Sequence, residues 1–89
     1  MKHVVKRRGH TEEYDEKKVY ASAYSASLNV HLGELEAEKI ASSVTSEVNK
    51  WVEEKTELSS QNIFEKVTEE LAKHNKDASF MYKTHRDVS

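Results

Sequence analysis

The sequence of 89 residues contains no cysteine, no proline and only two glycines, Gly9 and Gly33. Without cysteine, disulfide bonds, thiolate metal ligands and cysteine nucleophiles are all excluded. Two glycines are also too few for the glycine-rich loops that hold phosphate groups with backbone N–H donors. If the chain binds a phosphate group, its side chains must therefore make the contacts.

Long apolar stretches are missing as well. No run approaches the roughly 18 residues that are needed to span a bilayer. Residues 1–10 also lack the apolar stretch of a signal peptide. We therefore expect a cytoplasmic protein that has no membrane partner.

The composition fits one small folded domain over residues 1–89. Charged residues make up 34% of the chain and hydrophobic residues 36%. This mixture is too apolar for intrinsic disorder and too lean for a thick core. Because no repeat, linker or low-complexity segment interrupts the sequence, we expect thin helical packing around one core.

The net charge of −2 hides an uneven distribution. The first ten residues carry four cations and no acid, so the remainder has a net charge of −6; the cations are Lys2, Lys6, Arg7 and Arg8. A short basic segment on an otherwise acidic chain suits a small polyanion such as a nucleotide better than a long nucleic acid. Nucleic acid is therefore not the expected partner.

The two glycines mark the strongest turn signals in the chain. On either side of Gly9, residues 3–7 and 11–14 contain β-branched and aromatic residues, which predicts a β-hairpin over about residues 3–14. Two strands alone are only marginally stable in water. A helical layer must therefore cover the hairpin.

Helical periodicity predicts that layer, in helices over about residues 16–31, 34–54, 60–74 and 77–87. The first follows Asp15, a favourable N-cap residue. The second has the cleanest apolar stripe in the sequence. Ser59 or Ser60 is expected to cap the third helix, and Asp77 the fourth. The predicted fold class is α+β and mostly helical, with an N-terminal hairpin packed on a layer that resembles a four-helix bundle.

Residues for catalysis or metal binding do not occur in productive patterns. Serine, histidine and acidic residues are present, but not in the spacing of a triad or of a tuned carboxylate pair. The five histidines lack the i, i+4 spacing that aims two imidazoles at one metal. The helical spacing of the aromatic residues is typical of core packing; these are Tyr20, Tyr24, Trp51 and Tyr82. We expect neither an enzyme nor a metal site.

The densest polar cluster lies between Val4 and Val19, in the segment V-V-K-R-R-G-H-T-E-E-Y-D-E-K-K-V. Lys17 and Lys18 fall in the first turn of the predicted helix, where a cation opposes the helix dipole unless an anion binds nearby. This misfit indicates a phosphate site. A solvated charged edge, the commoner role of such clusters, explains the same residues and stays open at this point.

This segment resembles the opening of the ATP-cone, the nucleotide-binding regulatory domain of ribonucleotide reductases and of their transcriptional repressor. The family opening has the approximate pattern V-x-K-R-D-G, followed after a few residues by an acid, a hydrophobic residue, D or N, and then x-x-K-I. The matching residues here are Val4, Lys6, Arg7, Gly9, Glu12, Tyr14, Asp15, Lys18 and Val19.

Two later segments extend the resemblance over essentially the whole chain. Residues 60–71 resemble the family's S/T-x-x-I…V…L helix, and residues 82–86 its C-terminal Y-x-x-Y-R segment. Three positions depart from the family. Arg8 stands where Asp or Asn is common, Phe64 stands where some relatives have a ribose contact, and His85 replaces an aromatic residue.

The resemblance implies a site for the base of an adenine nucleotide. Val4 and Val19 are expected to wall the base. Glu12 and Asp15 are expected to accept hydrogen bonds from the adenine amino group, which suits a carboxylate. Asp15 is equally well explained as a helix cap. Ser60 is implied as a contact at the start of its helix.

The same resemblance implies a phosphate site made of cations. Lys6, Arg7 and Lys18 are expected to hold the phosphates, and Arg86 is a further phosphate contact. Arginine grips phosphate oxygens with paired donors. The implied effector is ATP or dATP, with Mg²⁺ as its companion ion.

Our leading hypothesis is an allosteric nucleotide-binding module that controls self-association in a homo-oligomer or the activity of a partner. The resemblance suggests a ribonucleotide reductase or a transcriptional regulator subunit as that partner. The alternative is an ATP-cone-like fold that has lost nucleotide binding and serves as a protein interaction module; Arg8, Phe64 and His85 motivate it. A nucleic-acid binder ranks last because the chain is acidic overall.

Overall fold

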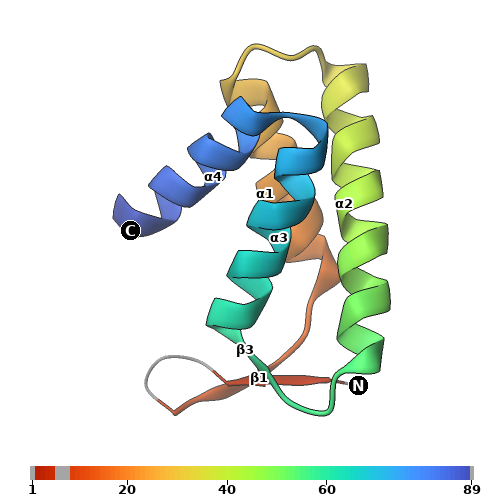
Figure 1. The fold of residues 1–89 in the computed structure, drawn as a ribbon, viewed down its shortest axis with the longest axis vertical. Helices are drawn as coiled ribbons and strands as arrows, with labels where there is room; N and C mark the ends of the chain where they lie inside the picture. The colour runs from red at the N-terminus through yellow and green to blue at the C-terminus, as the bar shows by residue number, and fades with distance from the viewer. Residues whose placement is uncertain (1, 6–8, 89) are drawn as a thin grey trace.

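The structure is a computed structural model that describes residues 2–5 and 9–88, with side chains described as far as His85. In this part of the chain a long helix and three shorter ones stand over a small sheet (Figure 1). The elements in order are β1 (His3–Val5), β2 (Thr11–Glu13), α1 (Glu16–Asn29), α2 (Glu34–Glu54), β3 (Leu58–Ser59), α3 (Ser60–His74) and α4 (Lys76–Val88). The fold class is α+β and mostly helical, as predicted.

The predicted hairpin is part of a three-stranded sheet with the order β2-β1-β3. Strand β1 pairs antiparallel with β2, placing Val4 opposite Glu12, and parallel with β3, placing Val4 also beside Leu58. The turn residue Gly9 has a φ of 81°, which an L side chain rarely adopts. The sequence prediction missed β3 because a two-residue strand has no readable alternation and its partner lies far away in the chain.

Helix α1 begins as predicted but ends two residues early. The Asp15 side chain caps it by accepting a 3.0 Å hydrogen bond from the Lys17 N–H. At its other end His31 has a φ of 68°. There the Leu32 N–H donates to the Ser27 carbonyl, and the His31 N–H to that of Leu28. These two bonds form a Schellman motif, which closes the helix at Asn29 rather than at the predicted residue 31.

The later helices agree closely with the periodicity. Helices α2 and α3 have the predicted bounds, and Ser59 caps α3 in a reciprocal capping box with Asn62. The predicted cap of α4 is wrong. Asn75, not Asp77, fills this role, because its side-chain oxygen accepts a 2.9 Å hydrogen bond from the Ala78 N–H. Helix α4 therefore starts one residue earlier than predicted, at Lys76.

The core lies where α1, α2 and α3 meet one another and the sheet. Its buried members are Val4, Val19, Ala23, Ile40, Ala41, Val44, Val48, Val52, Leu58, Val67, Leu71 and Ala78. The aromatic residues predicted to pack in the core are partly buried against this cluster. Val4 and Leu58 bring the sheet into the same core, which fixes the hairpin beneath the helices.

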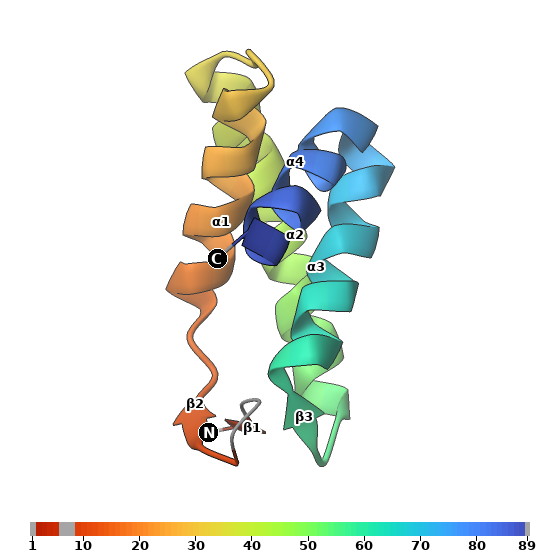
Figure 2. The ribbon, with the colours of Figure 1, turned by 90° about the vertical axis from the view of Figure 1, so that its left-hand side faces the viewer.

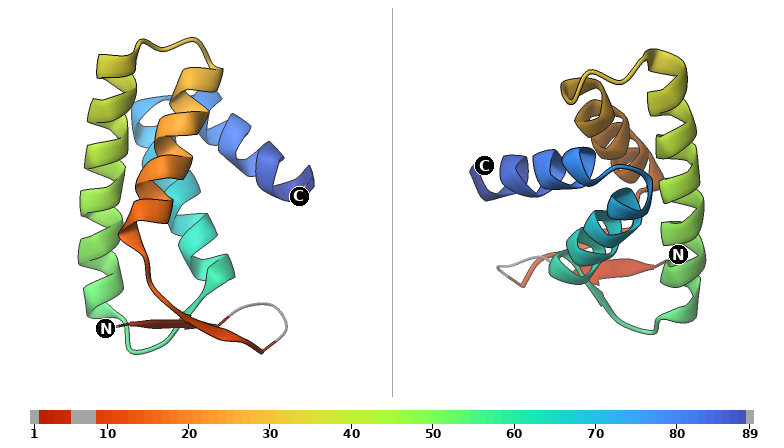
Figure 3. Two further views of the ribbon diagram at one scale, coloured as in Figure 1. Left: turned by 180° about the vertical axis from the view of Figure 1, so that it is seen from behind. Right: turned by 45° about the horizontal axis from the view of Figure 1, so that its top comes forward.

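Helices α1 and α3 stand side by side, with α4 between their upper parts and the sheet below them (Figure 2). Helix α2 runs along the back of this arrangement, and the free end of α4 points away from it (Figure 3). Among the described residues no helix is long and apolar enough to cross a membrane. The space framed by α1, α3, α4 and the hairpin is where the site lies.

Candidate functional site

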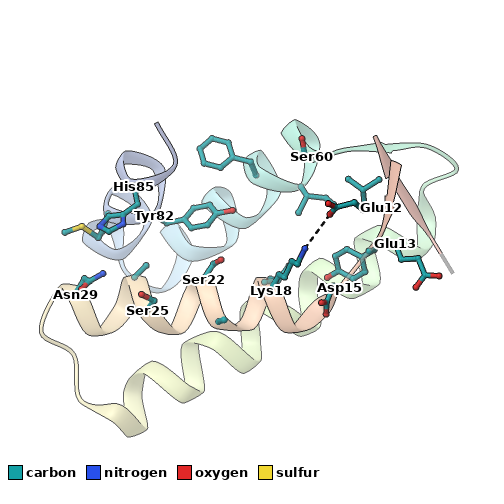
Figure 4. Close-up of a pocket in the computed structure, with 18 of the residues that line it drawn as sticks. Glu12, Glu13, Asp15, Lys18, Ser22, Ser25, Asn29, Ser60, Tyr82 and His85 are labelled. Carbon is teal, nitrogen blue, oxygen red and sulfur yellow. Dashed lines mark hydrogen bonds and ion pairs between the residues drawn. The ribbon is translucent and has the colours of Figure 1, made fainter. Parts of the chain in front are cut away.

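A cleft of about 1020 Å³ opens between the hairpin, α1, α3 and α4. Its walls come from β1, β2 and α1 in the first part of the chain and from α3 and α4 in the last part. Figure 4 shows the lining side chains. This volume is slightly above the range of roughly 300–1,000 Å³ that is usual for small-molecule sites. The cleft is therefore large enough for a nucleotide.

The hairpin end of the cleft combines apolar and acidic groups. Val4 on β1 and Val19 on α1 are buried and give this end an apolar floor. Glu12, Glu13 and Asp15 line the same end with carboxylates. A planar base with an exocyclic amino group meets here both an apolar surface and hydrogen-bond acceptors.

One face of α1 forms the long side of the cleft. Lys18, Ser22, Ser25 and Asn29 follow one another at spacings of four, three and four residues, which places all four side chains on one face of the helix. Figure 4 shows them along the length of α1, with the Lys18 side chain directed toward Glu12. They provide an ammonium group, two hydroxyls and an amide along the cleft.

The opposite wall, from α3 and α4, is largely apolar. The rings of Phe64 and Tyr82 stack with their centroids 5.3 Å apart and their planes inclined by 29°. Such a pair contributes about 0.5–1.5 kcal/mol beyond its burial. Ser79 on α4 also donates a 2.8 Å hydrogen bond to the Thr68 carbonyl of α3. These contacts hold α4 in place as a wall of the cleft.

Lys18 and Glu12 meet inside the cleft. The Lys18 ammonium lies 3.5 Å from Glu12 Oε2, and the two side chains are 69% and 47% exposed. An ion pair this exposed contributes only about 0–1 kcal/mol. A bound anion can therefore draw the Lys18 ammonium away from Glu12 at small cost.

Tyr14 joins the cleft to α2. Its hydroxyl donates a 2.7 Å hydrogen bond to Asn49 Oδ1, and the Asn49 amide donates in turn to Glu16. Burial, together with the nearby charges of Glu16 and Asp15, raises the pKa of Tyr14 to about 12. The hydroxyl thus remains protonated, and able to donate this bond, throughout the neutral range.

The structure brings six of the nine predicted site residues to this one cleft: Val4, Glu12, Asp15, Lys18, Val19 and Ser60. Lys6 and Arg7 lie outside the described residues. Arg86 belongs to α4, but its side chain is also outside the described part. Asp15 both caps α1 and lines the cleft, so the cap does not remove it from the site.

Several lining residues were not predicted as site residues. Ser22, Ser25 and Asn29 could have been found by extending the helical period from Lys18. Glu13 adjoins the predicted Glu12, and His10 lies two residues before it; neither gave a separate signal. Five more come from α3 and α4, and only the tertiary fold sets them opposite α1: Ile63, Phe64, Met81, Tyr82 and His85.

The sequence matches the family model of the ATP cone domain over residues 2–86. The chain belongs to the ATP-cone domain family. Domains of this family are regulatory modules that bind adenine nucleotides as effectors and are not catalytic. No curated protein matches the sequence.

The chemistry of the cleft suits an ATP-cone ligand. Apolar walls, carboxylate acceptors and the Lys18 ammonium meet at its hairpin end. Among the residues that the structure describes, no three histidine or acidic side chains cluster closely enough to hold a metal ion.

Proposed function

We propose that this ATP-cone chain binds ATP or dATP in the cleft and thereby regulates its own association or the activity of a partner protein. The observation that carries the proposal is the convergence of six implied site residues on one cleft of nucleotide size. Five of these residues lie within residues 4–19, and the fold brings Ser60, at the start of α3, to the same cleft.

In this proposal the base lies at the hairpin end of the cleft. Val4 and Val19 contact its faces, and Glu12 accepts a hydrogen bond from the adenine amino group. Lys18 binds a phosphate group together with Lys6, Arg7 and Arg86. Mg²⁺ enters with the phosphates, its usual mode of binding in nucleotide sites.

Regulation follows from the number of elements that one ligand contacts. A nucleotide in the cleft bridges the hairpin, α1, α3 and α4, so it favours the arrangement in which all four are closed around it. A ligand shifts an equilibrium only by its difference in affinity for the two states. The partner in this proposal is a ribonucleotide reductase, a transcriptional regulator subunit or a second copy of the chain, and the site of action is the cytoplasm.

A second candidate function is a protein interaction module without nucleotide binding. It is favoured by Phe64, which stands where some family members have a ribose contact and whose ring stacks on Tyr82. A phenyl ring offers no hydrogen bond to a sugar hydroxyl.

Titration calorimetry of the purified chain with ATP, dATP and GTP tests the proposal, with sizing chromatography in the presence and absence of ATP. We expect binding of both adenine nucleotides, weaker binding of GTP, and an elution volume that responds to ATP if the output is self-association. Absence of heat and of amide chemical-shift changes at millimolar ATP would favour the interaction module instead.

A further inference from the structure

The link between β2 and α1 joins the two halves of the proposed site. Glu12, assigned to the adenine amino group, lies on β2, and Lys18, assigned to a phosphate group, lies on α1. Only Tyr14 and Asp15 separate these two elements. The dashed line in Figure 4 joins the Lys18 ammonium to Glu12 Oε2 over 3.5 Å. The conformation of the link therefore sets the spacing between the base contact and the phosphate contact.

Asn49 on α2 holds this link with both ends of its side-chain amide. Its Oδ1 accepts a 2.7 Å hydrogen bond from the Tyr14 hydroxyl, and its Nδ2 donates a 3.1 Å hydrogen bond to Glu16 Oε2. The two bonded residues stand directly before and after Asp15. Asn49 itself does not line the cleft, so it acts on the site through the link.

The chemistry of the two partners matches an amide at residue 49. The Glu16 carboxylate only accepts hydrogen bonds. The Tyr14 hydroxyl donates, because burial and the nearby charges of Glu16 and Asp15 raise its pKa to about 12. An amide offers an acceptor and a donor on one planar group. A carboxylate at residue 49 would have no donor for Glu16 and would repel it, and an aliphatic side chain would make neither bond.

We propose that Asn49 is a positioning residue for the nucleotide, and that it holds the link so that Glu12 and Lys18 engage the base and the phosphates of one ligand together. This inference rests on the proposed function and adds to it a residue outside the cleft. A ligand that contacts both groups gains from their preorganised spacing, whereas inorganic triphosphate, which has no base, does not. Loss of the Asn49 bonds should therefore weaken ATP binding more than triphosphate binding.

The test compares the dissociation constants of ATP and of inorganic triphosphate, measured by titration calorimetry on the purified chain. Asn49→Leu removes both hydrogen bonds at similar side-chain size. The matched control is Ile40→Val, because Ile40 is buried on the same helix and does not line the cleft. Its loss of stability should be comparable to that from a lost hydrogen bond. Thermal unfolding checks that each variant is folded at the temperature of the titration.

An exchange of the amide and the carboxylate tests the inference without relying on Asn49→Leu. Asn49→Asp alone removes the donor to Glu16. When it is combined with Glu16→Gln, the introduced carboxylate can accept from both the Tyr14 hydroxyl and the introduced amide. The net charge of this double variant equals that of the wild type. Glu16→Gln alone is the control, since it still offers an acceptor to the Asn49 amide.

We expect the ratio of the triphosphate dissociation constant to that of ATP to fall about two- to tenfold in Asn49→Leu and in Asn49→Asp, the effect of one ordinary hydrogen bond. The double variant and both controls should keep the wild-type ratio. The further cations assigned to the phosphates are unchanged in every variant and act on both ligands, so they do not alter this comparison.

A folded Asn49→Leu variant that binds both ligands in the wild-type ratio would overturn this inference and leave the proposed function intact. An equal change of the ratio in Ile40→Val would overturn it too, because general loss of stability would then explain the effect. The same holds if the double variant keeps the lowered ratio of Asn49→Asp. If the wild-type chain does not bind ATP, the proposed function itself fails, so the two failures are distinguishable.

Discussion

The Tyr14 hydroxyl and the Asn49 side chain form a 2.7 Å hydrogen bond that ties the link between β2 and α1 to the C-terminal half of α2. The Tyr14 N–H also donates to the Lys2 carbonyl at 2.7 Å, so the same residue is anchored to the start of the hairpin. No described residue of α2 lines the cleft, whereas Tyr14 does. Tyr14 therefore connects the cleft to a helix that does not reach it.

We predict that Tyr14→Phe lowers the free energy of unfolding by about 0.5–1.5 kcal/mol, because it removes this hydrogen bond and keeps the ring. For a domain of this size the melting temperature should fall by roughly 4–8 °C per kcal/mol. Thermal unfolding followed by circular dichroism measures the change. Tyr20→Phe is the control, since Tyr20 is also half-buried against the core. Equal losses in the two variants would contradict the assigned role of the bond.

Lys18 and its neighbour Lys17 provide a matched pair for the phosphate site. Both are exposed in the first turn of α1, but only Lys18 lines the cleft. We predict that Lys18→Ala weakens ATP binding by about 1–3 kcal/mol, the range for loss of a charge-assisted contact. Lys17→Ala should leave the affinity nearly unchanged. Calorimetry on both variants tests this. Equal losses of ATP affinity would show that the overall charge of the helix start, and not a contact of Lys18, affects binding.

Glu12 is predicted to select the base. Glu12→Gln replaces a pure acceptor with an amide that also donates, so discrimination against guanine should weaken. The ratio of GTP to ATP dissociation constants should move toward one. Glu57→Gln, an exposed substitution between α2 and β3 and away from the cleft, is the control and should leave the ratio unchanged. An unaltered ratio in Glu12→Gln would remove this residue from base recognition.

The elements that the sequence predicted well are those that it encodes locally. The apolar stripe lies within α2, and the serine cap directly precedes α3. Both helices have the predicted bounds. The end of α1 was predicted wrongly because Gly33 seemed the natural residue for a turn. The left-handed residue is instead His31, while Gly33 has a φ of −68° and precedes α2.

The candidate site was predictable only in part, for a related reason. The family resemblance pointed to Lys18 and Glu12, which line the cleft. It did not reveal that they pair with each other, since that depends on how the hairpin lies on α1. Nor could the pattern place Tyr82 and His85 opposite α1, because the packing of α4 is set by contacts such as the Ser79 hydrogen bond to Thr68.

His31 yields a prediction about stability. A side chain in the left-handed conformation is strained, and glycine is the usual residue at this position of a Schellman motif. We predict that His31→Gly raises the free energy of unfolding by about 0.5–1 kcal/mol, measured by urea unfolding. Ala72→Gly, at an exposed position inside α3, should instead lower the free energy of unfolding by about 1 kcal/mol. If both variants are less stable than the wild type, the assigned strain at His31 is contradicted.

Glu70 yields a prediction about pH. It is only 3% exposed, and its Oε2 lies 3.0 Å from the Lys73 ammonium and 3.2 Å from that of Lys66. Burial alone raises the pKa of Glu70, but the contacts with the two lysines outweigh it and leave the pKa below its ordinary value. The folded state therefore binds the Glu70 proton more weakly than the unfolded state does.

It follows that Glu70 stabilises the fold at pH values above its unfolded pKa, and that this contribution is lost as the pH falls through the lowered folded pKa. At pH 7 we predict that Glu70→Gln lowers the free energy of unfolding by about 1–2 kcal/mol, near the lower end for charge-assisted hydrogen bonds because Lys73 is 60% exposed. Glu69→Gln, a substitution of the exposed neighbour, should change the free energy of unfolding little. Urea unfolding at several values from pH 7 down into the acid range should show the gap between wild type and Glu70→Gln closing as Glu70 becomes protonated. A gap that stays constant with pH would mean that packing, and not the charge on Glu70, sets its contribution.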